Sequence, residues 1–485
     1  MTKKILSMFF SLLIMLSMLP ADVFAEGFEY NFAGGSPYCG SLIMMNMDTG
    51  AVVYSNNADE QRPMASLTKI MTYIVTVETI PDLNNTRITV PQSVADDLAD
   101  TGSSLADIVV GEEFSVFELL HMMMIPSGND AAATLAAYID SLQITVGSLE
   151  SNEEIESQYE VIEEADEAET EAPPAEDPNR ILTFVDLMNR KAAELGCSNT
   201  HFVNAHGLHQ EGHYSTARDM LTIAEHALKL PYFSEITSKI YYDRPATDLV
   251  PNPNTLYNTN QLILQSSDLY YYQNATGIKT GSLNESGYCI VASATQTYTY
   301  VVVAMGSPYI DELGNRTDFH GEMLDSIELF NWAFSELKIK TIAENGKLMG
   351  DVALNYTWNQ DRLQVVAGEN IQAVLPSNVE SSSIIPVLEL PDSIDAPVKK
   401  GDSLGRATLT YADQVVGYVN LVAAESVERS EMMRTLEQGK AILTSTWFRF
   451  VMLGIAALVV IYLILIIISG KRRNRKRNRY HKRNM

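Results

Sequence analysis

Cysteine is scarce in this chain of 485 residues, which contains only Cys39, Cys197 and Cys289. Three cysteines cannot form the disulfide framework that stabilises many exported proteins, and at most one pair could bridge. The sequence has no Cys-x-x-Cys pair, so the common cysteine-based structural zinc sites are excluded. We therefore expect the three thiols to be buried as small hydrophobic side chains.

Basic residues are scarce over most of the chain, although both ends are basic. Between residues 26 and 470 there are 23 Lys and Arg residues against 60 Asp and Glu residues, a net charge of −37. Proteins that bind nucleic acid need a basic surface, so we exclude nucleic acid as a partner. The same charge should repel anionic polymers near the protein.

Long apolar runs are confined to the two ends of the chain. At the N-terminus, Lys3 and Lys4 precede an apolar stretch over residues 5–19, and the run Val23-Phe24-Ala25 suits cleavage after Ala25. This pattern is typical of a cleavable signal peptide, which we assign to residues 1–25. An uncleaved membrane helix is the alternative, but the apolar stretch is short and is interrupted by serines.

The C-terminal apolar run, residues 450–468, carries no charge. As a helix it would be about 28 Å long, close to the roughly 30 Å of a bilayer's hydrocarbon core, so we predict a transmembrane helix at 447–469. A basic tail follows at 470–485, and the positive-inside rule places it in the cytoplasm. The chain is thus expected to be a single-pass protein of the cell membrane whose main part is extracytoplasmic. A nucleic-acid-binding tail is the alternative, which a membrane helix directly before the tail disfavours.

One internal segment is dominated by acidic residues. Between Glu150 and Asp177 there are thirteen acidic residues, no basic residue and few apolar ones. Such a composition cannot bury enough apolar surface to fold alone. We predict a disordered insertion at 150–178, with binding of a cation or a basic partner as an alternative.

The hydrophobic periodicity on both sides of this insertion predicts an α+β domain at residues 26–340. Two apolar runs around Asp48-Thr49-Gly50 predict a β-hairpin at 41–54, and strand-like runs recur at 288–294 and 298–305. Because strands lie at both ends of the region, we expect one central antiparallel sheet. Helical patterns occur at 66–79, 116–124, 130–138, 181–195, 216–228 and 321–337.

The character of the sequence changes after residue 340. Short alternating segments broken by turns predict a small β-rich domain at 345–425. A helical stalk at 426–446 would connect this domain to the membrane helix.

Ser66 and Lys69 could form a nucleophile and its base. A serine hydroxyl is a weak nucleophile until a base takes its proton, and positions i and i+3 lie on one face of a helix. The lysine must be neutral to act as this base, and burial near other cations would lower its pKa. The Ser-x-x-Lys pattern is common, however, and alone it does not indicate catalysis.

A second motif, Ser127-Gly128-Asn129, follows a proline, and proline and glycine favour a turn there. In that turn Ser127 could relay protons and Asn129 could hold a substrate amide. Taken by itself, the triplet is equally well explained as a helix N-cap, with Ser127 or Asn129 capping a helix that begins at Asp130.

A third motif, Lys279-Thr280-Gly281, is predicted to form a turn just before a strand. Gly281 would let a ligand approach the backbone, and Lys279 and Thr280 offer donors to a carboxylate. An ordinary basic turn is the alternative. The histidines between residues 201 and 213 could bind zinc, but Gly207 and Gly212 among them favour a turn over a ligand-bearing helix.

In this order the three motifs resemble the active site shared by penicillin-binding proteins and serine β-lactamases. The runs around them are similar to those of the low-molecular-mass serine D-Ala-D-Ala carboxypeptidases, and the similarity covers roughly residues 36–340. The runs that carry it are Ala65–Thr72, Pro126–Ala132, Phe202–Leu208, His213–Asp219, Asn258–Asn260 and Gly277–Gly281.

The resemblance implies a penicillin-binding/β-lactamase-like transpeptidase domain, an antiparallel sheet flanked by helices, followed by the small all-β domain. It implies that Ser66 attacks the penultimate D-alanine carbonyl of a peptidoglycan stem pentapeptide and forms an acyl-enzyme, with Lys69 as its activator. Ser127 and Asn129 would then assist proton transfer and positioning.

The resemblance further implies that Lys279 and Thr280 bind the terminal carboxylate of the peptide. The oxyanion hole would consist of the backbone N–H groups of Ser66 and of Ser282, beside Gly281. No metal or organic cofactor is implied. The implied partners are peptidoglycan stem peptides, β-lactam antibiotics as covalent inhibitors, and the membrane.

The sequence departs from the family pattern in its acidic insertion, in Met64 where the family often has proline, and in a full C-terminal membrane span. A β-lactamase is a second candidate function, but it needs a carboxylate to activate the deacylating water. The sequence has Asp186-Leu187-Met188-Asn189 and no Glu-x-x-Leu-Asn. A D,D-endopeptidase and a catalytically silent wall-binding protein are two further candidate functions.

Overall fold

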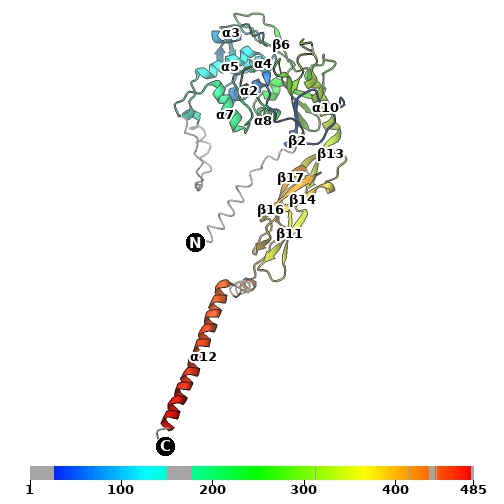
Figure 1. Cartoon of the computed structure of the whole chain (residues 1–485). Coiled ribbons are helices and arrows are strands. Elements are labelled where there is room, and N and C mark those ends of the chain that lie inside the picture. The colour runs from blue at the N-terminus through cyan, green and yellow to red at the C-terminus, as the bar shows by residue number, and fades with distance from the viewer. Residues whose placement is uncertain are drawn as a thin grey trace. The chain divides into compact units, whose positions relative to one another are not determined.

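The structure is a computed structural model of the chain (Figure 1). It describes residues 27–149, 177–311, 313–412, 414–435, 443 and 445–481. The predicted signal peptide and nearly all of the predicted acidic insertion lie outside the described residues. The chain divides into two compact units, Met1–Lys340 with Ala373–Val379 and Thr341–Gln372 with Glu380–Met485.

A five-stranded antiparallel sheet forms the centre of the first unit. Its strand order is β2-β1-β9-β8-β7, so strands from both ends of the region pair, and Ile43 of β1 lies opposite Val303 of β9. This arrangement confirms the central sheet predicted from the sequence. The strands are β1 (Ser41–Asn46), β2 (Ala51–Asn56), β7 (Ala275–Leu283), β8 (Gly287–Thr295) and β9 (Thr299–Ser307).

Most helices of the first unit lie between β2 and β7 in the chain. α4 begins with a capping box, in which Ser115 and Glu118 each accept a hydrogen bond from the other's backbone N–H. Thr183 and Asp186 do the same for α7, and such caps satisfy N–H groups that have no partner inside the helix. The helices are α2 (Thr68–Thr79), α3 (Gln92–Leu98), α4 (Val116–Met124), α5 (Asn129–Ser141), α7 (Phe184–Glu194), α8 (Ala217–Leu228), α9 (Phe233–Thr237) and α10 (Gly321–Glu336), and the short hairpins are β3 (Arg87–Thr89) with β4 (Glu113–Ser115) and β5 (Tyr241–Asp243) with β6 (Thr255–Tyr257).

The central sheet is buried on both faces, because successive side chains of a strand point to opposite sides. Ile43 and Met45 belong to a core that includes residues of α2, α4, α5, α7 and α8. Leu42 and Met44 belong to a second core that includes residues of α10. Figure 1 shows α10 on the opposite side of the strands from α2 and α5. The first unit therefore has three layers, with the sheet in the middle.

Lys279-Thr280-Gly281 lies inside strand β7, so the turn predicted for this motif is wrong. Glycine weakens a strand pattern, and Gly277 and Gly281 concealed this one. β7 nevertheless pairs with β8 along its length. Close packing explains why residue 281 is a glycine, since a Cβ at this position would lie 2.9 Å from the backbone nitrogen of Ser66.

The second unit contains a six-stranded sheet with the order β14-β16-β17-β12-β11-β15. Alternate residues of its strands are buried, as Leu363 and Val365 of β12 and Leu409 of β16 illustrate. This sheet confirms the small all-β domain that the sequence predicts. The strands are β11 (Leu348–Asn355), β12 (Arg362–Ala367), β14 (Ile385–Glu389), β15 (Ser393–Asp395), β16 (Ser403–Tyr411) and β17 (Gln414–Ala423), while β10 (Leu337–Ala343) and β13 (Ile371–Pro376) form a separate pair.

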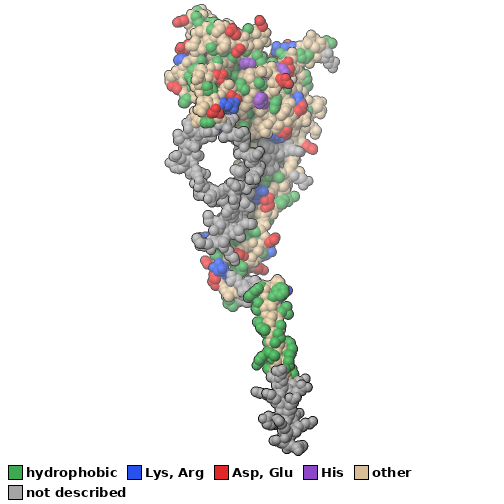
Figure 2. Space-filling model, turned by 60° about the vertical axis from the view of Figure 1, so that its left-hand side comes forward, with side chains coloured by type: hydrophobic (Ala, Val, Ile, Leu, Met, Phe, Trp, Pro, Cys, Tyr) green, Lys and Arg blue, Asp and Glu red, His purple; other side chains and the backbone are tan. Residues whose placement is uncertain are grey.

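A long helix, α12 (Thr446–His481), lies at the C-terminal end of the chain. Its part Thr446–Ile468 is long and apolar enough to cross a membrane, and no other helix in the described ranges meets that test. Figure 2 shows hydrophobic side chains along this part. This helix agrees with the predicted membrane span.

The predicted stalk at 426–446 is helical only in part among its described residues. Val427 forms a β-bridge with Val398, and helical residues begin at Glu431. The stretch 436–442 lies outside the described residues. The first residues of the predicted stalk are therefore tied to the β domain by backbone hydrogen bonds.

Candidate active site

Ser66 lies in a short 3-10 turn, η1 (Ala65–Leu67), directly before α2. Ala65 has a left-handed backbone with φ of 48°, a conformation that strains any residue with a Cβ. The Thr68 hydroxyl donates a hydrogen bond to the Ala65 carbonyl oxygen at 2.7 Å. This side chain therefore stabilises the turn that holds Ser66.

Lys69 is fully buried, and its side-chain nitrogen has three partners. Nζ lies 3.0 Å from Ser66 Oγ, 2.5 Å from Asn129 Oδ1 and 2.7 Å from the His206 carbonyl oxygen. The last two oxygens only accept, so they hold two N–H bonds of the amine in either charge state. A neutral lysine then has its lone pair left for the Ser66 hydroxyl. The geometry suits transfer of the Ser66 proton to Lys69.

The surroundings lower the pKa of Lys69 well below that of a free lysine. Burial is the main cause, because desolvation disfavours the ammonium form. The positive charge of Lys279 acts in the same direction, whereas the Asp130 carboxylate opposes it. Burial also lowers the pKa of Lys279 to about 7. These shifts favour the neutral form of Lys69.

Ser127 and Asn129 lie at the start of α5, which begins at Asn129 with Gly128 at its N-cap and no side-chain cap. The helix-capping alternative for this motif is therefore wrong. Ser127 is 4% exposed and has a left-handed φ of 64°. The Asn129 backbone N–H donates to the Ser104 carbonyl at 2.9 Å, while its side-chain oxygen accepts from Lys69.

The third motif approaches Ser66 from strand β7. Gly281 packs closely against the Ser66 backbone, which the absence of a Cβ allows. The Thr280 hydroxyl lies 2.6 Å from that of Thr259, and the buried Lys279 donates to the Thr280 carbonyl at 2.9 Å. The structure thus brings the three motifs together, although they lie far apart in the sequence. Ser282, the next residue of β7, pairs with Tyr288 in the register.

Several contributors to this site were not identified from the sequence. The Asp130 carboxylate accepts hydrogen bonds from the backbone N–H groups of Ala106, Ile108 and Ala131, which ties the loop before residue 109 to the second motif. The His206 carbonyl is a partner of Lys69. Asp130 follows Asn129 directly, so its place in the motif run was a usable signal. No signal in the sequence identifies a carbonyl group as a partner.

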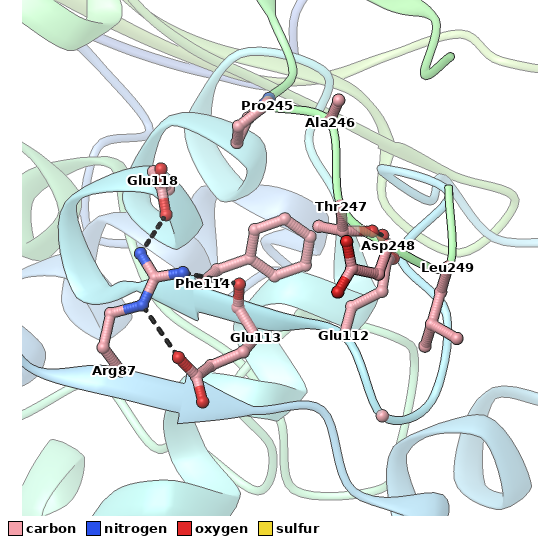
Figure 3. A pocket seen from close by; sticks show the side chains of 11 residues that line it. Arg87, Glu112, Glu113, Phe114, Glu118, Pro245, Ala246, Thr247, Asp248 and Leu249 are labelled. Carbon is pink, nitrogen blue, oxygen red and sulfur yellow. Dashed lines mark hydrogen bonds and ion pairs between the residues drawn. The ribbon is translucent and has the colours of Figure 1, made fainter. Parts of the chain in front are cut away.

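A separate cavity of about 360 Å³ lies between the β3–β4 hairpin and the segment 245–249 (Figure 3). Arg87 forms ion pairs of 3.1 Å with both Glu113 and Glu118 in its wall. The buried Glu112 pairs with Arg244. None of the site residues predicted from the sequence lines this cavity. The contacts of Glu112 with Arg244 and with the Thr247 hydroxyl connect the hairpin side of the cavity to the segment 245–249.

Metal-binding side chains do not cluster in the described part of the chain, where no group of three His, Cys, Asp or Glu residues could hold an ion. Cys39, Cys197 and Cys289 are free and buried. Burial raises the pKa of Cys197 and of Cys289 to about 12, so neither is a reactive thiolate at neutral pH.

Comparison with known proteins identifies the family. A family model described as D-alanyl-D-alanine carboxypeptidase matches residues 36–143 and 181–308. A second model, described as the C-terminal domain of penicillin-binding protein 5, matches residues 338–429. This chain belongs to the low-molecular-mass penicillin-binding protein family. The gap between the two matched parts of the first model contains the acidic segment, which is therefore an insertion relative to the family.

Individual members of this family match most of the chain. The D-alanyl-D-alanine carboxypeptidase DacF of Bacillus subtilis is 28% identical over 400 residues, which are 82% of this chain and 88% of the relative. DacC of Escherichia coli is 28% identical over 401 residues, 80% of this chain and 83% of the relative. The crystal structure of penicillin-binding protein 5 from Haemophilus influenzae shares the fold, with a TM-score of 0.57, 23% identity, and coverage of 81% of this chain and 98% of that one.

Proposed function

We propose that this penicillin-binding protein is a serine-type D-alanyl-D-alanine carboxypeptidase that removes the terminal D-alanine from peptidoglycan stem pentapeptides. The observation that carries the proposal is the buried amine of Lys69, which lies 3.0 Å from Ser66 Oγ while two fixed acceptors hold its other N–H bonds. A lysine so placed can act as a general base at neutral pH.

Acylation proceeds by attack of Ser66 Oγ on the carbonyl carbon of the penultimate D-alanine. The Ser66 proton passes to Lys69 Nζ, and the peptide C–N bond breaks. The leaving D-alanine amine takes a proton from the ammonium of Lys69, with Ser127 as the relay. Water then attacks the ester carbonyl and gives a proton to Lys69. The bond between Ser66 Oγ and the acyl carbon breaks, Oγ takes that proton from the Lys69 ammonium, and the shortened peptide is released.

Substrate binding uses the edge strand β7. Lys279 and Thr280 bind the terminal carboxylate of the peptide, and Asn129 positions its amide. The backbone N–H groups of Ser66 and Ser282 stabilise the oxyanion, a contribution worth about 10²–10³ in rate per donor in serine hydrolases. The close approach of Gly281 to the Ser66 nitrogen supports this assignment. β-Lactams acylate the same serine.

We also propose a topology for the protein. A single span at Thr446–Ile468 would leave the basic tail in the cytoplasm and the peptidase unit outside, where peptidoglycan is built. The signal-like N-terminus supports the same orientation. A cysteine-reactive, membrane-impermeant label on single-cysteine variants tests it, since labelling of residue 335 in intact cells is expected and labelling of residue 480 would contradict it.

The activity is tested by incubating the full-length protein in detergent with a stem pentapeptide and measuring free D-alanine. We expect D-alanine release from the wild type and from a Ser335→Ala control, which alters an exposed serine of α10, and none from Ser66→Ala. Release by Ser66→Ala would refute the nucleophile. Rapid penicillin turnover would indicate a β-lactamase, and cleavage of cross-linked dimers without pentapeptide trimming would indicate an endopeptidase.

A further inference from the structure

His213 is a buried histidine outside the proposed catalytic machinery. It is 4% exposed and lies near the fully buried Thr68 of α2. Its Nε2 atom is 2.8 Å from Thr68 Oγ1, and its Nδ1 atom is 3.0 Å from the backbone nitrogen of Val203. Both ring nitrogens are therefore engaged, one by a backbone donor and one by a hydroxyl.

The partners of His213 leave one tautomer. The Val203 N–H can only donate, so Nδ1 must be an unprotonated acceptor and Nε2 carries the proton. The Thr68 hydroxyl has a single proton, which it donates to the Ala65 carbonyl at 2.7 Å, and its oxygen is free to accept from His213 Nε2–H. The contacts with Val203 and with Thr68 therefore require the same tautomer of His213. The hydrogen bonds run in one direction, from His213 Nε2–H to the Thr68 oxygen and from the Thr68 hydroxyl to the Ala65 carbonyl.

This series of hydrogen bonds ends at Ala65, the strained residue directly before the nucleophile. Ala65 has φ of 48°, and its carbonyl group is enclosed by the segment that precedes His213. Gly207 packs so closely that a Cβ there would lie 2.0 Å from the Ala65 carbonyl oxygen. The same segment receives the Lys69 hydrogen bond at the His206 carbonyl. The position of Ser66 thus depends on how this segment holds the start of α2.

We propose that His213, as a neutral imidazole protonated on Nε2, is a positioning residue that fixes the Ala65–Ser66 turn through Thr68. The inference rests on the proposed function of Ser66. His213 does not touch Ser66 or Lys69 and transfers no proton in the reaction. Its contribution is to keep the Thr68 hydroxyl oriented toward the Ala65 carbonyl, so that Ser66 stays at the distance from Lys69 that proton transfer requires.

The surroundings of His213 support the neutral form. Burial, with smaller contributions from His201 and His209, lowers the pKa of His213 to about 4. An imidazolium would also place an Nδ1–H against the Val203 N–H, where no acceptor exists. The imidazole is therefore neutral throughout the physiological pH range. The hydrogen bonds from His213 to Thr68 and from Thr68 to Ala65 then keep the same donors and acceptors.

Two substitutions in series test the proposal. We expect His213→Phe, which keeps a ring and removes the donor, to slow acylation of Ser66 by a fluorescent penicillin about 10-fold, the effect of losing one buried hydrogen bond. Thr68→Val should slow it at least as much. Because the two groups act through one chain, the double variant should be no slower than Thr68→Val. Losses that multiply would overturn the proposal.

The readouts separate positioning from general destabilisation. The acylation rate constant should fall while the non-covalent affinity for penicillin stays within twofold, and His213→Gln, which retains an N–H donor, should recover most of the rate. A His201→Phe control alters the same segment at an exposed ring that binds the Gly212 carbonyl, and it should leave acylation unchanged. Wild-type rates in His213→Phe, with acylation still on Ser66, would refute the positioning role while leaving the proposed function intact.

A measurement on the unmodified protein covers the case in which a variant does not fold. Nitrogen-15 NMR of histidine-labelled full-length protein reports the tautomer directly. We expect His213 to show a protonated Nε2 and an unprotonated Nδ1 at pH 7. A proton on Nδ1 would reverse the donor chain and contradict the proposal.

Discussion

The two compact units differ in what they bury. The first unit buries charged and polar side chains, among them Lys69, Asp130 and Lys279, and every buried polar side chain of the described chain precedes residue 327. Two of the non-glycine residues with left-handed backbones, Ala65 and Ser127, lie in or directly beside the motifs, while Tyr356 and Ala412 are examples in the second unit. Burying charge and straining the backbone both cost stability. The motifs combine both costs at one place, whereas the described part of the β domain buries apolar side chains and no polar ones.

The largest expected effect comes from the proposed base. Replacing Lys69 with Met keeps the apolar stem and removes the amine, so the Ser66 proton has no acceptor. We expect penicillin acylation and D-alanine release to fall about 10²–10⁴-fold, the usual contribution of a general base. Stopped-flow fluorescence with a labelled penicillin measures the first quantity. A loss under threefold would mean that another group activates Ser66.

The next prediction compares two glycines with nearly equal backbones. Gly207 has φ of 93° and Gly401 has φ of 89°, but only a Cβ on Gly207 would meet a neighbour, the Ala65 carbonyl, whereas nothing lies within 4 Å of one on Gly401. Gly401→Ala should cost about 1–2 kcal/mol of unfolding free energy from the backbone alone. Gly207→Ala should cost more than about 3 kcal/mol and should also slow acylation.

Thermal unfolding and penicillin acylation of the two variants check this comparison. Gly401→Ala is expected to leave the acylation rate unchanged, because it lies in the β domain. Equal stability losses and equal acylation rates in the two variants would show that the Ala65 turn is not held by the Gly207 contact.

A smaller effect is expected on pH dependence. Acylation requires neutral Lys69, so its rate rises as pH increases through the Lys69 pKa. The Lys279 charge lowers that pKa; in Lys279→Gln the charge is missing, Lys69 is protonated more readily, and the rising limb should move to higher pH. A pH–rate profile of penicillin acylation measures the shift. An unchanged limb, or one that moves to lower pH, would contradict the proposed coupling of the two lysines.

The smallest effect on catalysis should come from the β domain. Leu409 is 1% exposed in β16, and Leu409→Ala should destabilise the second unit by about 2–5 kcal/mol. D-alanine release from a soluble pentapeptide should stay within twofold of wild type at temperatures where both units are folded. Chemical denaturation followed by circular dichroism checks the first expectation, and a large loss of activity in the folded variant would contradict the division of roles.

The parts of the fold and of the site that could be predicted from the sequence are those that depend on residues close together in the chain. The hairpin around Asp48 and the helix after Ser66 follow from local periodicity, and the motif residues from local patterns. β7 was missed because its glycines weaken the strand signal, although they serve packing, Gly281 against Ser66 and Gly277 against Thr237. The contact of Lys69 with the His206 carbonyl joins residues 137 apart in the chain, and the contact of Thr68 with His213 joins residues 145 apart. Such pairs depend on tertiary packing, which no local pattern encodes.

The central claim is that Ser66 is the nucleophile, and mass spectrometry of the penicillin-treated protein tests it most directly. We predict one stable adduct per chain, located by peptide mapping on the peptide that contains Ser66, and its absence in Ser66→Ala. An adduct on another residue, or an adduct of equal yield in Ser66→Ala, would contradict the account.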